Sequence, residues 1–179
     1  MKNKQYIYRF SKNIVDGNKN MADILGGKDA NLAEMCNLNI PVPPGFTVST
    51  YVCNYFLENN SFPKSFEQKL LSSINNVESD LGLRFGSTKR PLLFSVRSGG
   101  RQSMPGMMET VLNVGLTNKT IAGLIKQTND ERFVYDSYRR LIMMYADVVM
   151  EKANNLSSGI RHRLDSILIK IKKDKKIEH

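Results

Sequence analysis

The chain has 179 residues, and its 26 lysines and arginines outnumber 17 acidic residues to give a formal net charge of +9. Its 41% hydrophobic and 24% charged content is that of an ordinary globular domain and excludes collagen-like, disordered and low-complexity proteins. Two cysteines exclude a disulfide-rich scaffold, and no apolar run is long enough for a membrane span or a secretory signal. We therefore expect a reduced, soluble, cytoplasmic protein.

The first elements alternate between strand and helix. Residues 6–10 carry aromatic side chains at every second position, which predicts a strand, and the polar segment 13–20 predicts a loop. Residues 28–35 then predict a helix that begins after Gly26 and Gly27. The side chains expected to share the apolar face of this helix are Leu32, Met35 and Leu38.

A stiff proline-rich turn at 41–45 leads to a predicted strand at 46–48, after which Thr50 is expected to cap a short helix. The segment 66–81 predicts a longer helix, because its apolar residues fall three or four positions apart. Its predicted buried stripe consists of Phe66, Leu70, Leu71, Ile74, Val77 and Leu81.

The run 91–97 predicts a buried strand, and 110–114 predicts another. Helical spacing returns at 134–149 and again at 160–171, with a polar break at 154–159. Strands confined to the first 115 residues and followed by helices alone predict an α+β or α/β lobe with a helical extension.

The first candidate site is Gly26-Gly27-Lys28 at a helix start. A helix N-terminus has unpaired backbone N–H groups and partial positive charge, so glycines and a lysine there suit a phosphate group. The segment is not a usual P-loop, because Asp29 stands where that motif has a hydroxyl residue. The alternative interpretation is a glycine turn before an ordinary helix with an exposed lysine.

The second candidate is the glycine-rich loop that follows the predicted strand 91–97. Arg97 and Arg101 flank Ser98, Gly99 and Gly100, and two guanidinium groups beside accessible backbone can grip an oxyanion. Further donors or backbone access come from Gln102, Ser103 and Gly106. The methionines Met104, Met107 and Met108 either pack the loop onto the core or give a mobile lid an apolar underside. A structural loop with incidental arginines is the alternative.

Other features indicate structure rather than chemistry. The two histidines, His162 and His179, lack metal-ligand spacing with the cysteines, so we predict no metal site. Residues 135–140 resemble a helix face with outward charges. The end of the chain, 161–179, has seven lysines and arginines against three acidic residues, and we interpret it as a solvated basic tail.

Four segments in order and spacing carry a family resemblance: 26–35, 41–46, 95–99 and 103–113. The last contains Ser103-Met104-Pro105-Gly106-Met107-Met108-Glu109-Thr110, a methionine-rich stretch. Together they resemble the start of the pyruvate, phosphate dikinase family, and the run 132–145 extends the resemblance to about residues 6–150. The methionine-rich loop distinguishes this family from the related phosphoenolpyruvate synthases.

The resemblance implies an α+β fold, in which residues 1–116 form an ATP-grasp-like N-terminal lobe and 117–179 a helical extension with a basic tail. In this family the domain binds ATP with Mg²⁺ and passes the β-phosphate to a histidine on a separate domain. By position, Lys28 and Arg97 would hold ATP phosphates, and the loop from Ser98 to Thr110 would cover them. The implied binding residues are Lys28, Arg97, Ser98, Gly99, Arg101, Ser103, Gly106, Met107, Met108 and Thr110.

The family's enzymes are several times longer, so the resemblance implies that several parts lie outside this chain. These are the second ATP-grasp lobe with its Mg²⁺-binding carboxylates, the phosphohistidine domain and the pyruvate-binding barrel. No catalytic residue is therefore expected here. Asp29 stands where the family usually has a glycine after the lysine. Its carboxylate suits the helix dipole, but it would repel a phosphate and weaken ATP binding if it turned inward. Gly100 stands where the family usually has an alanine, which makes the loop more flexible.

Three functions follow as hypotheses. The leading one is an ATP-binding fragment of pyruvate, phosphate dikinase, which converts ATP, phosphate and pyruvate to AMP, pyrophosphate and phosphoenolpyruvate. Its partners would be ATP and a separate chain carrying the remaining domains, with no membrane. The alternative is a non-catalytic remnant that acts as a protein-interaction module. A nucleic-acid-binding protein that uses residues 161–179 is the third, but that tail lacks interleaved aromatic residues.

Overall fold

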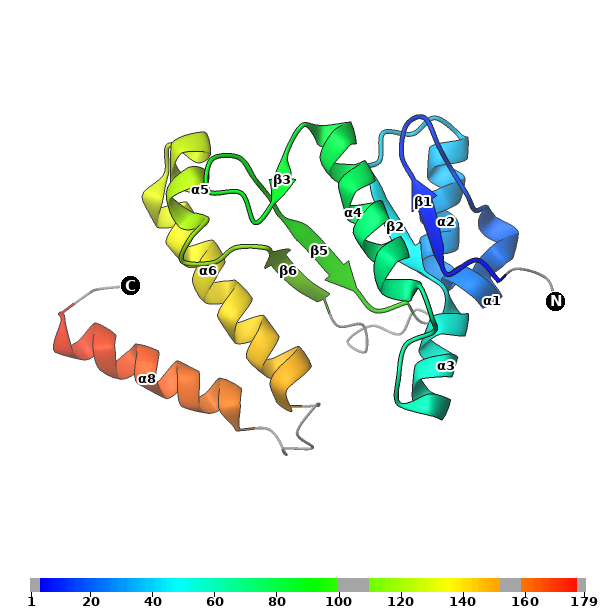
Figure 1. Cartoon of the computed structure of the whole chain (residues 1–179). Coiled ribbons are helices and arrows are strands. Elements are labelled where there is room, and N and C mark those ends of the chain that lie inside the picture. The colour runs from blue at the N-terminus through cyan, green and yellow to red at the C-terminus, as the bar shows by residue number, and fades with distance from the viewer. Residues whose placement is uncertain (1–3, 100–109, 152–158, 177–179) are drawn as a thin grey trace. The chain divides into compact units, whose positions relative to one another are not determined.

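The computed structural model describes residues 4–99, 110–151 and 159–176 (Figure 1). The chain divides into two compact units, the first formed by Met1–Phe85 and Ser98–Met108, the second by Gly86–Arg97 and Glu109–His179. Small antiparallel strand pairs and helices make the fold α+β, as the sequence predicts. In the described ranges the last strand ends at Val114 and only helices follow it.

The first unit contains an antiparallel pair of strands, β1 (Ile7–Phe10) and β2 (Gly45–Val48). Ile7 lies opposite Val48, and Phe10 lies opposite Gly45. Gly45 leaves room for the Phe10 ring, because a Cβ atom there would lie 2.6 Å from Cζ of Phe10. Both strands confirm the predictions made from the alternation at 6–10 and from the proline turn.

Helices complete the first unit and cover its core. The core is a cluster of Ile7, Val52 and Phe66, around which Tyr6, Phe46, Tyr51 and Leu70 pack. The remaining elements of the unit are η1 (Lys19–Met21), α1 (Ala22–Leu25), α2 (Gly27–Asn37), α3 (Thr50–Asn59), α4 (Phe66–Leu81) and β3 (Arg84–Phe85).

Helix α4 has the predicted bounds, but its predicted stripe is too wide. Phe66 and Val77 are buried, whereas Leu71 is 61% exposed and Leu81 is 41% exposed. The buried side also includes Ser73, whose hydroxyl donates to the Lys69 carbonyl at 2.9 Å. A hydroxyl that bonds within its own helix can be buried, so the buried face does not follow the apolar residues alone.

The predicted buried face of α2 is wrong. Ala30 and Ala33 are the buried residues, while Met35 and Leu38 are exposed and Leu32 is half-buried. The backbone of the preceding loop comes close at this point, since a Cβ atom on Gly17 would lie 3.3 Å from Cβ of Ala33. Only small side chains fit such a close approach, and a search for large apolar residues misses them.

The predicted cap of α3 is also wrong. The helix begins at Thr50, but Ser49 occupies the N-cap position and neither side chain caps the helix. The Thr50 hydroxyl instead donates to the Asp23 carbonyl at 2.8 Å. This bond ties the start of α3 to α1, which a local capping rule cannot foresee.

The second unit contains the strands β4 (Pro91–Leu92), β5 (Phe94–Arg97) and β6 (Thr110–Val114). The single buried strand predicted at 91–97 is thus interrupted at Leu93, and Val96 is 54% exposed. In the described ranges β5 pairs with β6 alone in its sheet, and Ser95, Val96 and Arg97 of this strand are all exposed. The register shifts between Phe94 and Val96, opposite a stretch of β6 in which Asn113 has a φ of 62°.

The core of the second unit is formed by Leu116, Ile121, Leu124 and Val134. Its helices are α5 (Ile121–Thr128), α6 (Glu131–Tyr145), the π-helix η2 (Ala146–Met150) and α8 (Ile160–Asp174). The predicted helices at 134–149 and 160–171 are confirmed. None of the helices in the described ranges combines the length and hydropathy that crossing a membrane requires.

Helix α8 is held by polar contacts at its start. Oε1 of the buried Glu151 accepts hydrogen bonds from the N–H groups of Gly159, Ile160 and Arg161 at 3.1, 2.7 and 3.3 Å. Arg161 also donates to Asp147 at 2.8 Å. No residue of α8 in the described range is fully buried, although Ile160, Leu164 and Leu168 are half-buried, so these polar contacts add to a shallow apolar face.

We expect the Glu151→Gln variant to loosen the start of α8. The backbone hydrogen bond from Gly159 is the main cause that lowers the pKa of Glu151 from its ordinary value of 4.5. A lowered pKa means that the carboxylate stabilises the folded state fully above pH 4.5, and that this is lost as the pH falls through the lower folded value. Hydrogen exchange at neutral pH should therefore be faster at the amides of 159–161 in this variant.

The matched control is Glu67→Gln, which removes an exposed first-turn glutamate from α4. This control should leave exchange in α8 unchanged. Equal exchange at 159–161 in the wild type and in Glu151→Gln would contradict the capping role.

Gly123 in α5 is a point where two backbones touch. A Cβ atom there would lie 2.8 Å from the carbonyl carbon of Thr88 and closer still to its oxygen. Because backbone cannot move aside as a side chain can, we expect Gly123→Ala to lower the free energy of unfolding by about 1–3 kcal/mol. Urea denaturation measures this change. The exposed Gln127→Ala on the same helix should stay within about 0.5 kcal/mol, and an equally small effect for Gly123→Ala would contradict the close approach.

Candidate functional site

The candidate site starts from the backbone of Gly26. This residue is buried and has a φ of 82° and a ψ of 156°, a region that only glycine adopts readily. Its N–H donates to the Ala22 carbonyl at 2.9 Å, and its own carbonyl accepts from the N–H of Ala30 at 3.0 Å. One glycine therefore ends α1 and begins α2.

This junction places Gly27, Lys28 and Asp29 in the first turn of α2. The N–H groups of Gly27 and Lys28 precede the first backbone hydrogen bond of the helix, and Gly26 has no side chain with which to cap them. Lys28 is exposed, so its ammonium group is accessible to a ligand. Asp29, half-buried in the same turn, is favoured there by the helix dipole. The turn offers backbone donors and one mobile cation to an anion.

Gly99 meets this first turn. A Cβ atom built on Gly99 would lie 3.4 Å from the Leu25 carbonyl oxygen and 3.6 Å from Oδ2 of Asp29. Both are ordinary contact distances, so the start of the glycine-rich loop lies against the end of α1 and the start of α2. The structure thus brings together two stretches that are some 70 residues apart in sequence, Gly26–Asp29 and Ser98–Gly99, within the first unit.

Arg97 and Thr110 belong to the second unit, where they lie opposite each other in the register of β5 and β6. Arg97 is exposed and Thr110 is half-buried. Directly opposed residues of an antiparallel pair have neighbouring side chains. The glycine-rich loop therefore follows Arg97 and precedes Thr110, two residues that face each other on the paired strands β5 and β6. The predicted site residues Arg101, Ser103, Gly106, Met107 and Met108 lie outside the described residues.

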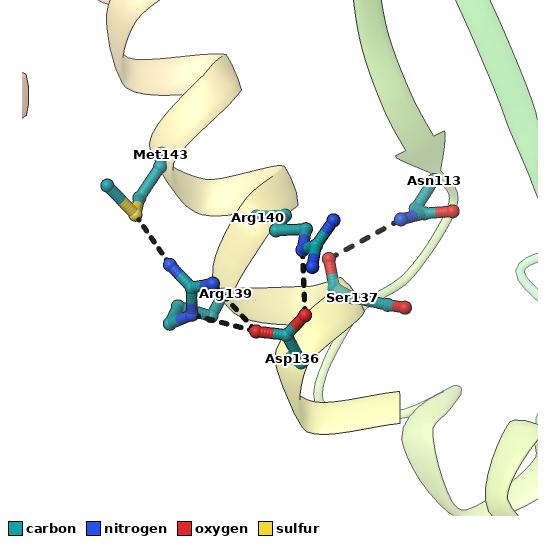
Figure 2. Close-up of polar contacts among 6 residues, drawn as sticks. All are labelled: Asn113, Asp136, Ser137, Arg139, Arg140 and Met143. Atoms are coloured by element: carbon teal, nitrogen blue, oxygen red, sulfur yellow. Dashed lines mark hydrogen bonds and ion pairs between the residues drawn. The ribbon is translucent and has the colours of Figure 1, made fainter. Parts of the chain in front are cut away.

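Asp136, Arg139 and Arg140 form a cationic cluster on α6 (Figure 2). The sequence predicts only a helix face with outward charges at this place. Oδ1 of Asp136 accepts from Nε and Nη2 of Arg139 at 3.1 and 2.7 Å, and Oδ2 accepts from Nε of Arg140 at 2.7 Å. Nη1 of Arg139 contacts the Met143 sulfur at 3.1 Å. The hydrogen bond from Arg139 is the main cause that lowers the pKa of Asp136.

One carboxylate thus orients two guanidinium groups, and the cluster keeps one positive charge in excess. The adjacent Ser137 carbonyl accepts from the side-chain amide of Asn113 at 3.5 Å, which links α6 to β6. The spacing of an aspartate with arginines three and four positions later could have indicated these pairs from sequence. In the described ranges, no group of three or more His, Cys, Asp or Glu residues could hold a metal ion.

Part of this chain is similar to a known nucleotide-binding domain. Residues 22–82, which contain the glycine junction and Lys28, match the family model described as pyruvate phosphate dikinase, AMP/ATP-binding domain. The chain is 48% identical over 166 residues to a pyruvate, phosphate dikinase of Rickettsia bellii, an alignment that covers 91% of this chain and 19% of the relative.

Two further relatives agree with this match. The identity is 50% over 147 residues to the enzyme of Rhizobium meliloti, covering 82% of this chain and 16% of the relative. It is 48% over 152 residues to pyruvate, phosphate dikinase 2 of Oryza sativa subsp. japonica, covering 85% and 17%. The chain spans about a fifth of the length of the curated relatives it matches.

The matched domain class is that of nucleotide-binding domains from phosphotransferases. Within that class, the chain belongs to the pyruvate, phosphate dikinase family. The resemblance carried by the four sequence segments is thereby confirmed.

We expect the Gly26→Ala variant to disturb the α1–α2 junction. Alanine at a φ of 82° and a ψ of 156° is strained, so the free energy of unfolding should fall by about 1–3 kcal/mol. Thermal and urea unfolding measure this change. Asn31→Ala, at an exposed position of α2, is the control and should change stability by less than about 0.5 kcal/mol. A Gly26→Ala variant as stable as that control would refute the strain argument.

Proposed function

We propose that this chain supplies an ATP-grasp-like, ATP-binding lobe of a pyruvate, phosphate dikinase, with residues 1–116 as the lobe and 117–179 as a helical extension. The observation that carries the proposal is the glycine junction with Lys28, which lies within residues 22–82, the region similar to an AMP/ATP-binding domain. Gly99, which follows that region in the sequence, lies against this junction. A nucleotide phosphate would accept hydrogen bonds from the first turn of α2. Lys28 would add a full positive charge.

The same proposal gives Arg97 and the loop that follows it a phosphate-covering role. Arg97 is exposed at the end of β5 and offers five N–H donors in a planar fork, which fits phosphate oxygens. Ser98 and Gly99 would bring backbone donors to the first turn of α2. Arg101, Ser103, Gly106, Met107, Met108 and Thr110 complete the proposed loop. These groups bind and orient charge, and none of them is assigned as a nucleophile.

The complete reaction needs more than these residues. ATP would bring Mg²⁺ with it, and we assign no metal ligand to the described ranges, where no suitable cluster occurs. When bound, the ion would neutralise charge on the phosphates. The histidine that takes up the phosphoryl group and the pyruvate site are proposed to lie in the remaining domains, supplied by a separate chain. This chain's contribution is to hold ATP so that its phosphates are presented to that partner.

Calorimetric titration with ATP and Mg²⁺ tests the proposal. Lys28→Ala removes one charge-assisted contact, so ATP binding should weaken by about 10-fold to 100-fold, and Arg97→Ala should have a similar effect. The matched control is Lys126→Ala, which removes an exposed lysine from the last turn of α5. That variant should bind ATP as the wild type does.

Two outcomes would count against the proposal. One is a folded wild type that binds no ATP, which would favour the alternative of a non-catalytic interaction module. The other is equal ATP affinity in Lys28→Ala and Lys126→Ala, which would mean that the helix start is not the phosphate site. Circular dichroism of each variant shows whether it is folded.

A further inference from the structure

An open pocket lies in the first unit, beside β1. It has a volume of about 410 Å³ and is lined by β1, the residues just before it and one face of α4. Among the described residues, neither Lys28 nor the loop residues Ser98 and Gly99 line it. A water molecule occupies roughly 30 Å³ in the liquid, so the pocket has room for a group several times larger.

The pocket is strongly positive. Among the described residues that line it, Lys4, Arg9 and Lys69 carry positive charge and none carries a carboxylate. Three cations that line one concavity repel each other unless an anion lies between them. This arrangement favours a ligand with more than one negative charge.

Among the described residues, the contacts that position the two lysines are with aromatic rings. Nζ of Lys4 lies 4.1 Å from the ring centroid of Tyr51, and Nζ of Lys69 lies 5.3 Å from that of Tyr6. The two tyrosine rings stack on each other at 5.8 Å between centroids. Contact with an aromatic ring holds an ammonium group in place without neutralising it, so both charges remain available to a ligand.

Arg9 forms an ion pair that offsets part of its charge. Its Nη2 lies 3.9 Å from Oδ2 of Asp80, and its side chain stays 25% exposed while it lines the pocket. The face of α4 adds neutral donors, because Ser72 and Asn76 follow Lys69 at helical spacing and line the same pocket. Cationic side chains from β1, from the segment just before it and from α4 thus line one pocket, together with hydroxyl and amide groups of α4.

We propose that this pocket binds a small phosphoryl oxyanion with two or three negative charges, at a site separate from the proposed ATP-phosphate site. Its charge and donors would recognise either free pyrophosphate or the phosphate of a nucleotide. Arg9 and Lys69 make the main charged contacts, Lys4 adds long-range attraction, and Ser72 and Asn76 donate hydrogen bonds to the remaining oxygens.

Titration of the ¹⁵N-labelled full chain with inorganic pyrophosphate, followed by amide chemical shifts, tests this proposal. We expect shifts at 69–76 and 5–9, and about tenfold weaker binding in Lys69→Ala, which changes an exposed side chain. Lys69→Arg keeps the charge and should stay within about threefold of the wild type. Adenosine monophosphate in a second titration shows whether a nucleotide phosphate binds more tightly than free pyrophosphate.

Two control variants separate this site from the proposed ATP-phosphate site. Lys28→Ala and Lys126→Ala should both retain pyrophosphate shifts at 69–76. Loss of those shifts in Lys28→Ala, unchanged affinity in Lys69→Ala, or no shifts in the wild type would each overturn the proposal. A wild type that fails with ATP but shows these shifts would refute the ATP-phosphate site alone. Raising the salt concentration should weaken pyrophosphate binding, because partly exposed charges are screened.

Discussion

The candidate phosphate site depends on one backbone conformation, that of Gly26. At this residue the chain ends α1 and starts α2, with Gly26 alone between the two helices. A side chain at Gly26 would be strained at its φ of 82° and ψ of 156°. The same junction brings Ala30 and Ala33 into the core, where small side chains allow a close approach of the loop at Gly17. The position of Lys28 is therefore a consequence of backbone geometry before any ligand is considered.

Sequence periodicity predicts those elements whose stability comes from their own pattern. The bounds of α4 and the existence of strands β1 and β2 follow from apolar spacing and from the proline turn, and the structure has them. The sequence does not predict the pairing of β1 with β2. Burial is harder to predict because it depends on what covers a face. Val96 and Leu71 are apolar and yet exposed, because no buried contact in the described ranges covers the part of β5 or α4 on which they lie. Close backbone contacts at Ala33 and Gly123 carry no hydrophobic signal at all.

The candidate site likewise has a part that the sequence predicts and a part that only the structure shows. Gly26, Gly27 and Lys28 could be identified locally, because a glycine pair before a helix has a physical meaning by itself. That Gly99 lies against this turn could not, since it requires the tertiary fold. The pocket beside β1 gave no sequence signal, because Arg9 and Lys69 are 60 residues apart and meet only when α4 packs beside β1. Short-range rules find helix ends and strand ends, whereas convergent side chains from distant elements need coordinates.

Positively charged side chains have different neighbours on α6 and beside β1. On α6, Asp136 pairs with both Arg139 and Arg140, which fixes their geometry and removes part of their charge. Beside β1, Lys4 and Lys69 lie over stacked tyrosines, which fix position and leave the charge intact. The carboxylate of Asp136 offsets the repulsion between the two neighbouring arginines, so this pairing stabilises the folded protein without a ligand. Placement over an aromatic ring leaves repulsion in the empty pocket that an incoming anion would relieve, so these lysines are better suited to a ligand than to stability.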